Sequence, residues 1–388
     1  MLRLKSARIH MDESLLIAVA ALLAIGYVMV TSASLHLGEQ GDGNEFSYPV
    51  RQMFHILLGL FAAVVVAVVP TKFWEKSGQW LFLFGLSLLV FVLVPGLGKE
   101  VNGAVRWLVL GGLRIQVSEI VKLISVIYIA GYITRHVETM RTSDYGMVKP
   151  LMLLSFACVL LLLEPDFGAA VVILATALAM MFLGGARVWQ FVLLVALVSL
   201  LGIALIYTSP YRMDRLTSFM DPWEDPLDTG FQLIQALIAF GRGEWFGVGL
   251  GGSVQKLFYL PEGHTDFLFS VIGEELGFAG VSVIIGLFSV IIWRAFWIGK
   301  NAEWIGRRFS AFLAYGIGIW FGLQAFVNMG VNLGILPTKG LTLPLMSYGG
   351  GSMIVMCCGV ALLFRVHYET AHFLNQIPKR NMRWLRAS

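Results

Sequence analysis

Long runs of apolar residues, separated by short polar stretches, occupy most of this chain. A helix needs about 17–25 mainly apolar residues to cross the hydrocarbon core of a bilayer. By this measure we predict about ten transmembrane helices, near residues 14–34, 53–70, 79–95, 115–133, 151–164, 168–184, 188–207, 267–298, 310–336 and 346–367. The pattern therefore predicts an all-α polytopic membrane protein that forms a single domain over residues 1–388.

The basic residues predict which side of the membrane each loop faces. Short cytoplasmic loops of membrane proteins are enriched in Lys and Arg. If the N-terminus is cytoplasmic, the inner loops and tails hold 18 of the 28 Lys and Arg residues. We therefore expect both termini in the cytoplasm, with tails at residues 1–13 and 368–388. The first apolar run, Leu15 to Val30, is too long for a signal-peptide core and is expected to remain as an anchor.

The longest stretch without a membrane helix, residues 208–266, lies between the seventh and eighth predicted helices. The orientation above places this large loop on the extracytoplasmic side. It contains eight Asp and Glu residues together with several aromatic residues, so it is not expected to be disordered. Within it, residues 231–240 repeat apolar side chains at helical spacing, which is typical of a helix that lies on a membrane surface. We expect the loop to fold back over the bundle.

The composition agrees with a membrane protein. Hydrophobic residues make up 57% of the chain and charged residues only 13%, whereas soluble domains carry about 25% charged residues. The net charge of +4 follows from the topology of the loops and does not indicate nucleic-acid binding. All three cysteines lie in apolar runs without a C-x-x-C spacing, so no disulfide or metal role is predicted for them.

Among the charged residues inside predicted membrane helices, Glu119, Lys122, Glu274 and Glu275 need an explanation. A charged side chain at the centre of such a helix costs at least about 2.5–3.5 kcal/mol. Glu119 and Lys122 are three residues apart, so they share a helix face and partly neutralise each other. Glu274 and Glu275 point to different faces, so we expect one to face a site and the other to brace a neighbouring helix. The sequence leaves open whether these charges form structural ion pairs or line a polar cavity.

A second concentration of polar groups lies where the long loop enters the eighth predicted helix. Glu262, His264 and Asp266 fall within seven residues of Leu260. Thr265 or Asp266 would be suited to cap that helix. A carboxylate at a helix N-terminus also stays ionised, and it is suited to act as a general base or to hold a divalent ion. The residues themselves do not decide between these roles.

Several cations in the predicted outer loops are suited to bind phosphate. Arg106 and Arg114 flank Trp107, which is either a membrane anchor or a site residue. Further cations in outer loops are Arg212, Arg215 and Lys339, and Ser347 lies at the start of the last predicted helix, where backbone amides are suited to meet an anion. The glycine-rich residues 247–252 follow no predicted strand and precede no Gly-Lys-Ser/Thr, so we exclude nucleotide binding.

Three motifs, taken in order, resemble the SEDS family of polytopic cell-wall glycosyltransferases. They are Leu260-Pro-Glu-Gly-His-Thr-Asp-Phe, Ile272-Gly-Glu-Glu-Leu-Gly-Phe278 and Leu336-Pro-Thr-Lys-Gly-Leu-Thr-Leu-Pro-Leu-Met-Ser-Tyr-Gly-Gly350. The likeness spans nearly the whole chain, and the Thr-Lys-Gly-Leu form resembles the division branch of the family rather than the elongation branch. Val117 departs from the family, which commonly has Pro at this position. Gly263 and Gly351 are two further departures from the family.

The resemblance implies polymerisation of lipid II into glycan strands at the outer face of the bacterial inner membrane, at the division septum. It implies a class B penicillin-binding transpeptidase of the FtsI type and other divisome membrane proteins as partners. Asp266 matches the family's catalytic aspartate, acting as a base or with a divalent cation such as Mg²⁺ or Mn²⁺. We expect substrate contacts from Arg106, Trp107, Arg114, Glu119, Lys122, Arg212, Arg215, Glu262, His264, Glu274, Glu275, Lys339 and Ser347.

Other functions remain open at the level of sequence. A transporter or lipid II flippase would use Glu119, Lys122 and the glutamate pair as a translocation path. That function explains Asp266 less well, because carriers place their binding sites near the midplane of the membrane. A scaffold of the division machinery would need no catalytic residue, and an elongation-type polymerase would share the same chemistry.

Overall fold

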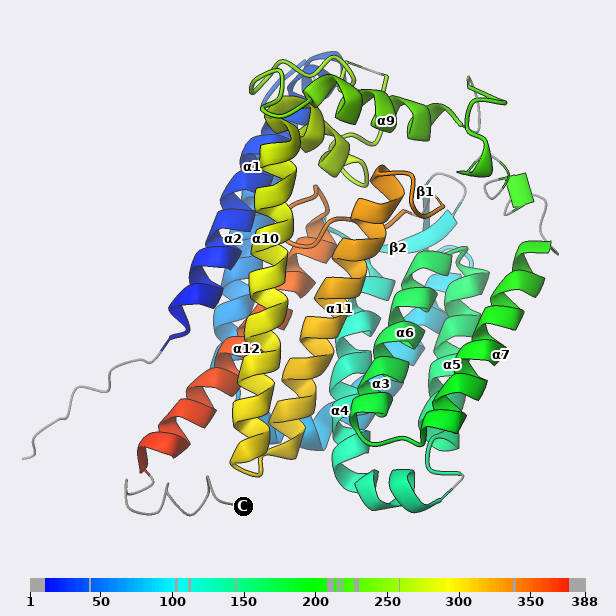
Figure 1. Ribbon diagram of the computed structural model, residues 1–388, viewed down its shortest axis with the longest axis vertical. Coiled ribbons are helices and arrows are strands. Elements are labelled where there is room, and N and C mark those ends of the chain that lie inside the picture. The colour runs from blue at the N-terminus through cyan, green and yellow to red at the C-terminus, as the bar shows by residue number, and fades with distance from the viewer. Residues whose placement is uncertain are drawn as a thin grey trace, which may run out of the picture.

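The helices of the protein follow the predicted apolar runs. The computed structural model describes residues 11–41, 43–101, 104–110, 113–143, 145–207, 213–214, 217, 219–226, 230–257, 259–337 and 340–376. The helices are α1 (Glu13–Gly41), α2 (Ser47–Val68), α3 (Thr71–Leu93), α4 (Val117–Thr142), α5 (Val148–Leu163), α6 (Phe167–Leu183), α7 (Val188–Tyr207), α9 (Phe231–Gly243), α10 (Leu268–Trp304), α11 (Arg308–Asn332) and α12 (Gly350–Gln376). All except α9 run along the bundle, and α1 begins on the side where α12 ends (Figure 1).

The described helices fall into two groups by length. Seven are long and apolar enough to cross a membrane, namely α1, α2, α3, α4, α10, α11 and α12. The helices α5, α6 and α7 are also apolar but shorter. A mainly helical fold with several membrane spans is thus confirmed. Helix α10 extends to Trp304, beyond the predicted bound at residue 298, because hydropathy detects only the apolar part of a helix whose polar end continues past it.

The fold-class prediction missed a small β-sheet. Strands β1 (Lys99–Val101), β2 (Ala104–Leu110) and β3 (Leu113–Gln116) form an antiparallel sheet in the order β1-β2-β3. Val105, Trp107 and Val109 alternate along β2 and are β-branched or aromatic, which favours a strand. Strands this short are stable only when they are paired, so a search for long apolar runs does not detect them. Helix α4 starts directly after β3, and the sheet therefore determines where α4 begins.

Helix α4 is the span most enclosed by the protein. In its most apolar stretch, 83% of the residues are buried, and it packs against α3, α6, α11 and α12. A helix that is surrounded in this way exposes few side chains to lipid. Its charged residues therefore face other helices, where partners are available.

The described part of the segment between α7 and α10 folds over one end of the bundle. Helix α9 crosses the upper end of the molecule in Figure 1 and packs against α10 and α11. Leu233, Ile234, Ala236 and Ala239 are buried in this contact. The amphipathic helix predicted at residues 231–240 is present, and the buried part of its apolar face lies against protein.

Helix α10 is divided near its start. Gly277 has backbone angles of φ 64° and ψ −164°, which no helix allows. The chain after α9 enters this break, where the amides of Val248 and Phe278 bond with the carbonyls of Glu274 and Glu244 over 3.0 and 2.9 Å. The short first part of α10, which follows Asp266, is thereby oriented independently of the long second part.

Candidate active site

A buried ion pair lies in the first turns of α4. Glu119 and Lys122 are exposed by only 4% and 1%, and their Oε1 and Nζ atoms are 2.7 Å apart. Lys122 also donates to Oε1 of Gln324 in α11 over 2.7 Å. Glu119 accepts a 3.2 Å hydrogen bond from Ser352 in α12. The predicted pairing is confirmed, and it connects three helices.

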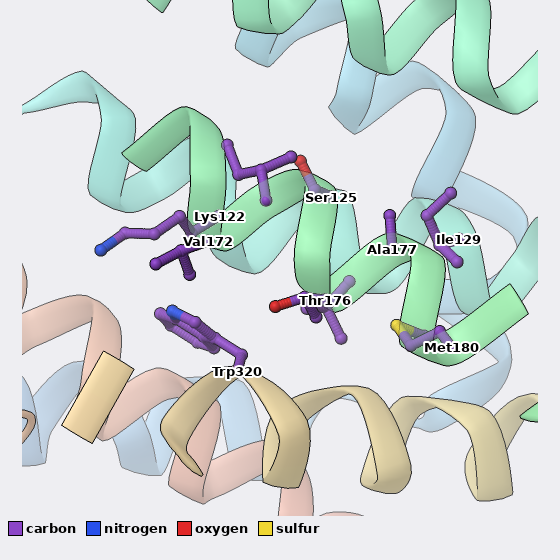
Figure 2. Close-up of a pocket in the computed structure, with 10 residues that line it drawn as sticks. Lys122, Ser125, Ile129, Val172, Thr176, Ala177, Met180 and Trp320 are labelled. Carbon is purple, nitrogen blue, oxygen red and sulfur yellow. The ribbon is translucent and has the colours of Figure 1, made fainter. Parts of the chain in front are cut away.

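A small cavity lies beside this pair, between α4, α6 and α11. Its volume is about 10 Å³, close to the space that one water molecule needs. Figure 2 shows Lys122 and Trp320 at one end of the cavity and Met180 at the other. The hydroxyl of Thr176 lines it and has no hydrogen-bond partner among the described residues. The cavity is sized for a water molecule and not for a sugar or a lipid.

The turn between α5 and α6 brings another carboxylate to the start of α4. Asp166 caps α6, because its Oδ1 accepts a 3.1 Å hydrogen bond from the amide of Ala169. Its Oδ2 accepts from the hydroxyl of Ser118 over 2.7 Å and from the side-chain amide of Gln116 over 2.9 Å. Asp166 therefore ties the sheet and the first turn of α4 to α6.

Arg106 is anchored to the same turn. Its Nε donates to the carbonyl of Glu164 over 3.0 Å, and its NH2 group donates to the carbonyl of Pro165 over 2.8 Å. Strand β2 carries the arginine to this position. Because both acceptors are neutral carbonyls, these two bonds do not neutralise the guanidinium charge. Arg106 is thus positioned and remains suited to bind a phosphate.

Asp266 does not cap α10. The helix begins at Leu268, and its capping residue is Phe267, which makes no side-chain capping bond. The predicted capping role of Thr265 or Asp266 is therefore wrong. The hydroxyl of Thr265 instead donates to the carboxylate of Glu262 in the preceding turn.

The backbone of Asp266 is held from α11. Its carbonyl accepts hydrogen bonds from the side-chain amides of Asn328 and Asn332, over 2.8 and 2.9 Å. Oδ1 of Asn332 also accepts from the amide and the hydroxyl of Ser270, over 3.1 and 2.7 Å. The two asparagines fix the position of Asp266 while they leave its carboxylate unused.

The carboxylate of Asp266 receives no hydrogen bond from any described side chain or amide. It keeps some accessible surface, but the protein encloses it, and this burial raises its pKa to about 7. The charge of Glu262 raises the pKa further, Arg106 opposes the rise, and Asp166 and Glu119 add to it. A carboxylate with such a pKa is suited to accept a proton near neutral pH.

These electrostatic effects show which predicted residues the fold brings together. Glu119, Arg106 and Glu262 all lie close enough to act on Asp266. The loop after α11 also reaches it, since a Cβ atom built on Gly340 would lie 3.3 Å from its Oδ2. Three further candidates, Lys339, Arg212 and Arg215, lie outside the described residues.

His264 lies two residues before Asp266, between aromatic rings. Its ring centroid is 5.3 Å from that of Tyr48 and 5.6 Å from that of Tyr348. Burial lowers the pKa of His264, an effect that the charge of Glu262 opposes and that His36 reinforces. A neutral imidazole therefore lies beside the acidic site at physiological pH.

Glu274 and Glu275 are both used in structural bonds. Each is fully buried. Glu274 accepts from Arg242 over 2.7 Å, whereas Glu275 accepts from Lys256 over 2.7 Å and from Ser32 of α1 over 2.8 Å. The expectation that one of them faces the site is corrected here, because both brace neighbouring segments. We leave them out of the proposed site.

The remaining candidates occupy different environments. The hydroxyl of Ser347 is buried and accepts from the amide of Leu343 over 2.9 Å, so it serves its own turn rather than an anion. Trp107 is half-buried on β2. Arg114 is exposed on β3, and its charge acts on Tyr348.

The described residues do not form a metal-binding cage. Within them, no three side chains of His, Cys, Asp or Glu gather closely enough to hold an ion. A divalent cation at Asp266 would take most of its ligands from the substrate or from water.

The polar residues of α11 were not among the predicted site residues. Gln324, Asn328 and Asn332 are fully or almost fully buried, and they recur at intervals of four residues on one helix face. Such a row of amides inside a membrane helix is itself a signal of a polar interior. Asp166, which directly precedes an apolar run, had the signal of a helix cap.

Comparison with known proteins places the chain among relatives of one kind. A probable peptidoglycan glycosyltransferase FtsW of Methylomonas methanica is 60% identical over 376 residues, which cover 97% of this chain and 96% of the relative. The corresponding protein of Methylococcus capsulatus is 60% identical over 370 residues, covering 95% and 93%.

Solved structures agree in fold. A chain of a peptidoglycan synthase complex is 31% identical, covers 93% of this chain and 98% of that chain, and has a TM-score of 0.76. The rod shape determining protein RodA of Thermus thermophilus is 29% identical, with a TM-score of 0.69 and coverage of 93% and 97%. The FtsW/RodA/SpoVE family of cell cycle proteins matches residues 13–372, and this chain therefore belongs to that family.

Proposed function

We propose that the protein is a peptidoglycan glycosyltransferase that polymerises lipid II into glycan strands during septal cell-wall synthesis. The observation that supports this most is the environment of Asp266. Its carboxylate is enclosed, has a raised pKa and accepts no hydrogen bond from the described residues, while two asparagines hold its backbone. Relatives 49–60% identical to this chain bear the name of such an enzyme.

The reaction follows from these residues. The 4-hydroxyl of the acceptor sugar gives its proton to Asp266 as the oxygen bonds to the anomeric carbon of the donor. The bond from that carbon to the lipid-linked pyrophosphate breaks, and the pyrophosphate leaves with the bonding electron pair. Arg106, which its two carbonyl partners do not neutralise, stabilises the negative charge on the leaving group.

The topology agrees with this activity. We assign ten membrane spans, α1–α7 and α10–α12, which place both termini in the cytoplasm. The sheet, the α5–α6 turn and the loops on either side of Asp266 then lie at the outer end of the bundle. Lipid II would meet Asp266 at the extracytoplasmic face of the inner membrane.

A class B penicillin-binding transpeptidase of the FtsI type is the partner that we assign, within a larger set of divisome membrane proteins. A peptidoglycan synthase complex contains a chain with the same fold. Crosslinking by such a partner would act on the strands that this protein makes. The septum is the location that this assignment requires.

Transport is less well supported by the geometry. The charges of Glu119 and Lys122 neutralise each other, and both side chains also form hydrogen bonds with uncharged partners. The cavity beside Lys122 has room for about one water molecule. A path for lipid II through the bundle would need a far larger opening.

The test is polymerisation of labelled lipid II by the purified protein with its transpeptidase partner. Asp266→Asn keeps the shape of the side chain but removes the base, so polymer formation should fall by about 10²–10⁴-fold while lipid II binding persists. Asp221→Asn, which changes an exposed carboxylate, is the matched control. Polymerisation by Asp266→Asn at the rate of the control would refute the catalytic assignment.

The same assay reports the pH dependence and the need for a cation. Since Asp266 must be ionised to accept a proton and its pKa is raised to about 7, the rate should rise with pH up to about 7 and then level off. Loss of activity with a chelator, restored by Mg²⁺ or Mn²⁺, would identify a cation that binds with the substrate. Lipid II translocation without polymer in proteoliposomes would favour a flippase, and division supported in cells by Asp266→Asn would favour a scaffold.

A further inference from the structure

Five residues from two helices, a loop and a third helix form a closed network of hydrogen bonds, in which Lys122 donates to Glu119 and to Gln324 over 2.7 Å each. The side-chain amide of Gln324 donates to the carbonyl of Thr342, in the loop after α11, over 3.1 Å. The hydroxyls of Thr342 and Ser352 are 3.1 Å apart. Ser352 in α12 closes the network, because it donates to Glu119 over 3.2 Å. We refer to these five residues as the closed network.

The ion pair fixes the direction of every bond in the closed network. The ammonium of Lys122 can only donate, and the ionised carboxylate of Glu119 can only accept. Ser352 therefore gives its one proton to Glu119, and its oxygen accepts the proton of Thr342. Oε1 of Gln324 accepts from Lys122, which leaves the amide nitrogen of Gln324 to donate to the carbonyl of Thr342. The network thus begins and ends at one residue of the loop, and all its bonds agree in polarity.

The loop segment of residues 340–343, which the closed network holds, also lies against Asp266. A Cβ atom built on Gly340 would lie 3.3 Å from Oδ2 of Asp266. Asn328 of α11 donates from one nitrogen to the carbonyls of Leu341 and Asp266, over 2.6 and 2.8 Å. Asn328 and the glutamine of the closed network therefore hold the carbonyls of two consecutive residues in this segment, and Asn328 holds the backbone of Asp266 as well.

The buried ion pair is thus connected to Asp266 in two ways. The charge of Glu119 acts on the carboxylate of Asp266 through space. The closed network also fixes the position of the segment that lies next to that carboxylate. The two effects are separable, because the loss of the hydroxyl of Thr342 opens the network and changes no charge.

We propose that Gln324, Thr342 and Ser352 are positioning residues of the transferase, which hold the 340–343 segment against Asp266 by anchoring it to the buried ion pair. An acceptor hydroxyl must come within hydrogen-bond distance of Asp266 to lose its proton, and a misplacement of about 1 Å can slow a reaction about a hundredfold. This inference rests on the proposed function. It adds to that function a task for the charges of α4, which act on the reaction through this segment.

The activity test compares Thr342→Val with Thr342→Ser, in the complex with the transpeptidase partner. Valine keeps the shape of the side chain but removes the hydroxyl, whereas serine keeps the hydroxyl. Thr342→Val and Ser352→Ala should each lower kcat for polymerisation of lipid II by about ten- to a hundredfold with little change in KM, and Thr342→Ser should keep most of the parent rate. Thr134→Val is the matched control, because the hydroxyl of Thr134 donates to a carbonyl of its own helix, that of Ala130.

The pH profile and a double variant distinguish positioning from an effect of charge or of substrate binding. The kcat of Thr342→Val should depend on pH with the midpoint of the parent, since no charge has changed. Thr342→Val combined with Ser352→Ala should be no slower than the slower single variant, because both changes break the same link. A kcat of Thr342→Val equal to that of Thr134→Val would overturn the proposal. A rise in KM that accounts for the whole loss would overturn it too, because it would assign Thr342 to substrate binding.

Hydrogen exchange tests the positioning without turnover. The amides of Met346 and Ser347 bond to the carbonyl of Leu343 over 3.3 and 3.1 Å, so their exchange reports whether the segment keeps its place. Exchange over residues 340–347 should be faster in Thr342→Val and Ser352→Ala than in the parent, and it should stay at the parent rate in Thr342→Ser and Thr134→Val. Unchanged exchange in the first two variants would overturn the proposal. A parent complex that makes no polymer would instead contradict the proposed function, so the two failures are distinguishable.

Discussion

The carboxyl group of Glu164 differs from an ordinary carboxylate in its burial and its protonation. The residue is 1% exposed, and neither of its carboxyl oxygens has a hydrogen-bond partner among the described residues. Burial raises its pKa to about 8, Asp166 adds to the rise and Arg106 opposes it. Glu164 therefore carries a proton at neutral pH. An uncharged Glu164 adds no negative charge of its own beside the guanidinium of Arg106, which suits a group that must meet pyrophosphate.

This assignment predicts a pH-dependent effect of Glu164→Gln on stability. Between the unfolded pKa of 4.5 and the folded pKa of about 8, the unfolded chain loses the proton that the folded protein keeps. The stability contribution of Glu164 is thus full below pH 4.5 and is lost progressively as the pH rises to about 8. Glutamine does not titrate. The free energy of unfolding of the variant should therefore rise relative to that of the parent by a few kcal/mol across this window.

Thermal unfolding in detergent at several pH values between 5 and 8.5 measures the difference in stability between Glu164→Gln and the parent protein. The exposed Glu138→Gln is the control, for which the difference from the parent should not change with pH. A difference for Glu164→Gln that stays constant over the whole range would show that this carboxyl is already ionised in the folded protein.

At the scale of elements, the break in α10 is the feature that positions Asp266. Four hydrogen bonds between backbone groups of the chain after α9 and of α10 replace the helical bonds that are lost at the break, among them Gly249 N to Glu275 O at 3.1 Å and Ala279 N to Trp245 O at 3.0 Å. Buried backbone groups are thereby satisfied on both sides of the interruption. The segment that follows Asp266 can then lie against α11 while the rest of α10 spans the bundle.

Gly277 is the residue on which this break depends. Its positive φ is strained for any other residue, and a Cβ atom there would lie 2.4 Å from the amide nitrogen of Gly247. Gly277→Ala should therefore destabilise the protein by about 1–3 kcal/mol or more and reduce polymerisation several-fold. Gly286→Ala is the control in the same helix, because a Cβ atom there meets nothing within 4 Å and alanine favours a helix.

Thermal unfolding and polymerisation assays of the two variants check this. A lowered melting temperature is expected only for Gly277→Ala. Equal behaviour of the two alanine variants would mean that the break does not control the position of the segment that carries Asp266.

At the scale of the whole molecule, a buried clamp joins segments that are far apart in the chain. Lys256 pairs with Glu275 over 2.7 Å and donates to Ser32 of α1 over 2.9 Å. Ser32 in turn donates to Glu275. One carboxylate thus connects α1, the segment after α9 and α10. Since α10 follows Asp266 closely in the chain, this clamp links the first helix to the helix next to the site.

The clamp predicts non-additive stability changes. Lys256→Met leaves Glu275 buried without its counter-charge and should cost about 3–5 kcal/mol. The double variant Lys256→Met/Glu275→Gln removes both charges and should cost less than the sum of the two single changes. Melting temperatures of the four proteins measure this coupling. If the double variant loses as much stability as the two single variants together, the two charges do not stabilise each other.

The class of the fold and part of the site follow from local patterns in the amino-acid sequence. Long apolar runs predict membrane helices because span length and hydropathy are local properties. The Glu119–Lys122 pair was predictable for the same reason, since three residues separate its members on one helix. The position of Asp266 in the site was expected from a motif resemblance rather than from its own neighbours.

How these parts meet depends on contacts between distant segments of the folded chain. The sheet at residues 99–116, the break at Gly277 and the amides that hold Asp266 all depend on pairs of groups that are distant in the chain. The sequence did not distinguish Glu274 and Glu275 from site residues, yet both are used in contacts that brace neighbouring segments. A charge buried in a membrane protein needs a partner, but its local sequence does not state which distant segment supplies one. That choice is made by the packing of the helices.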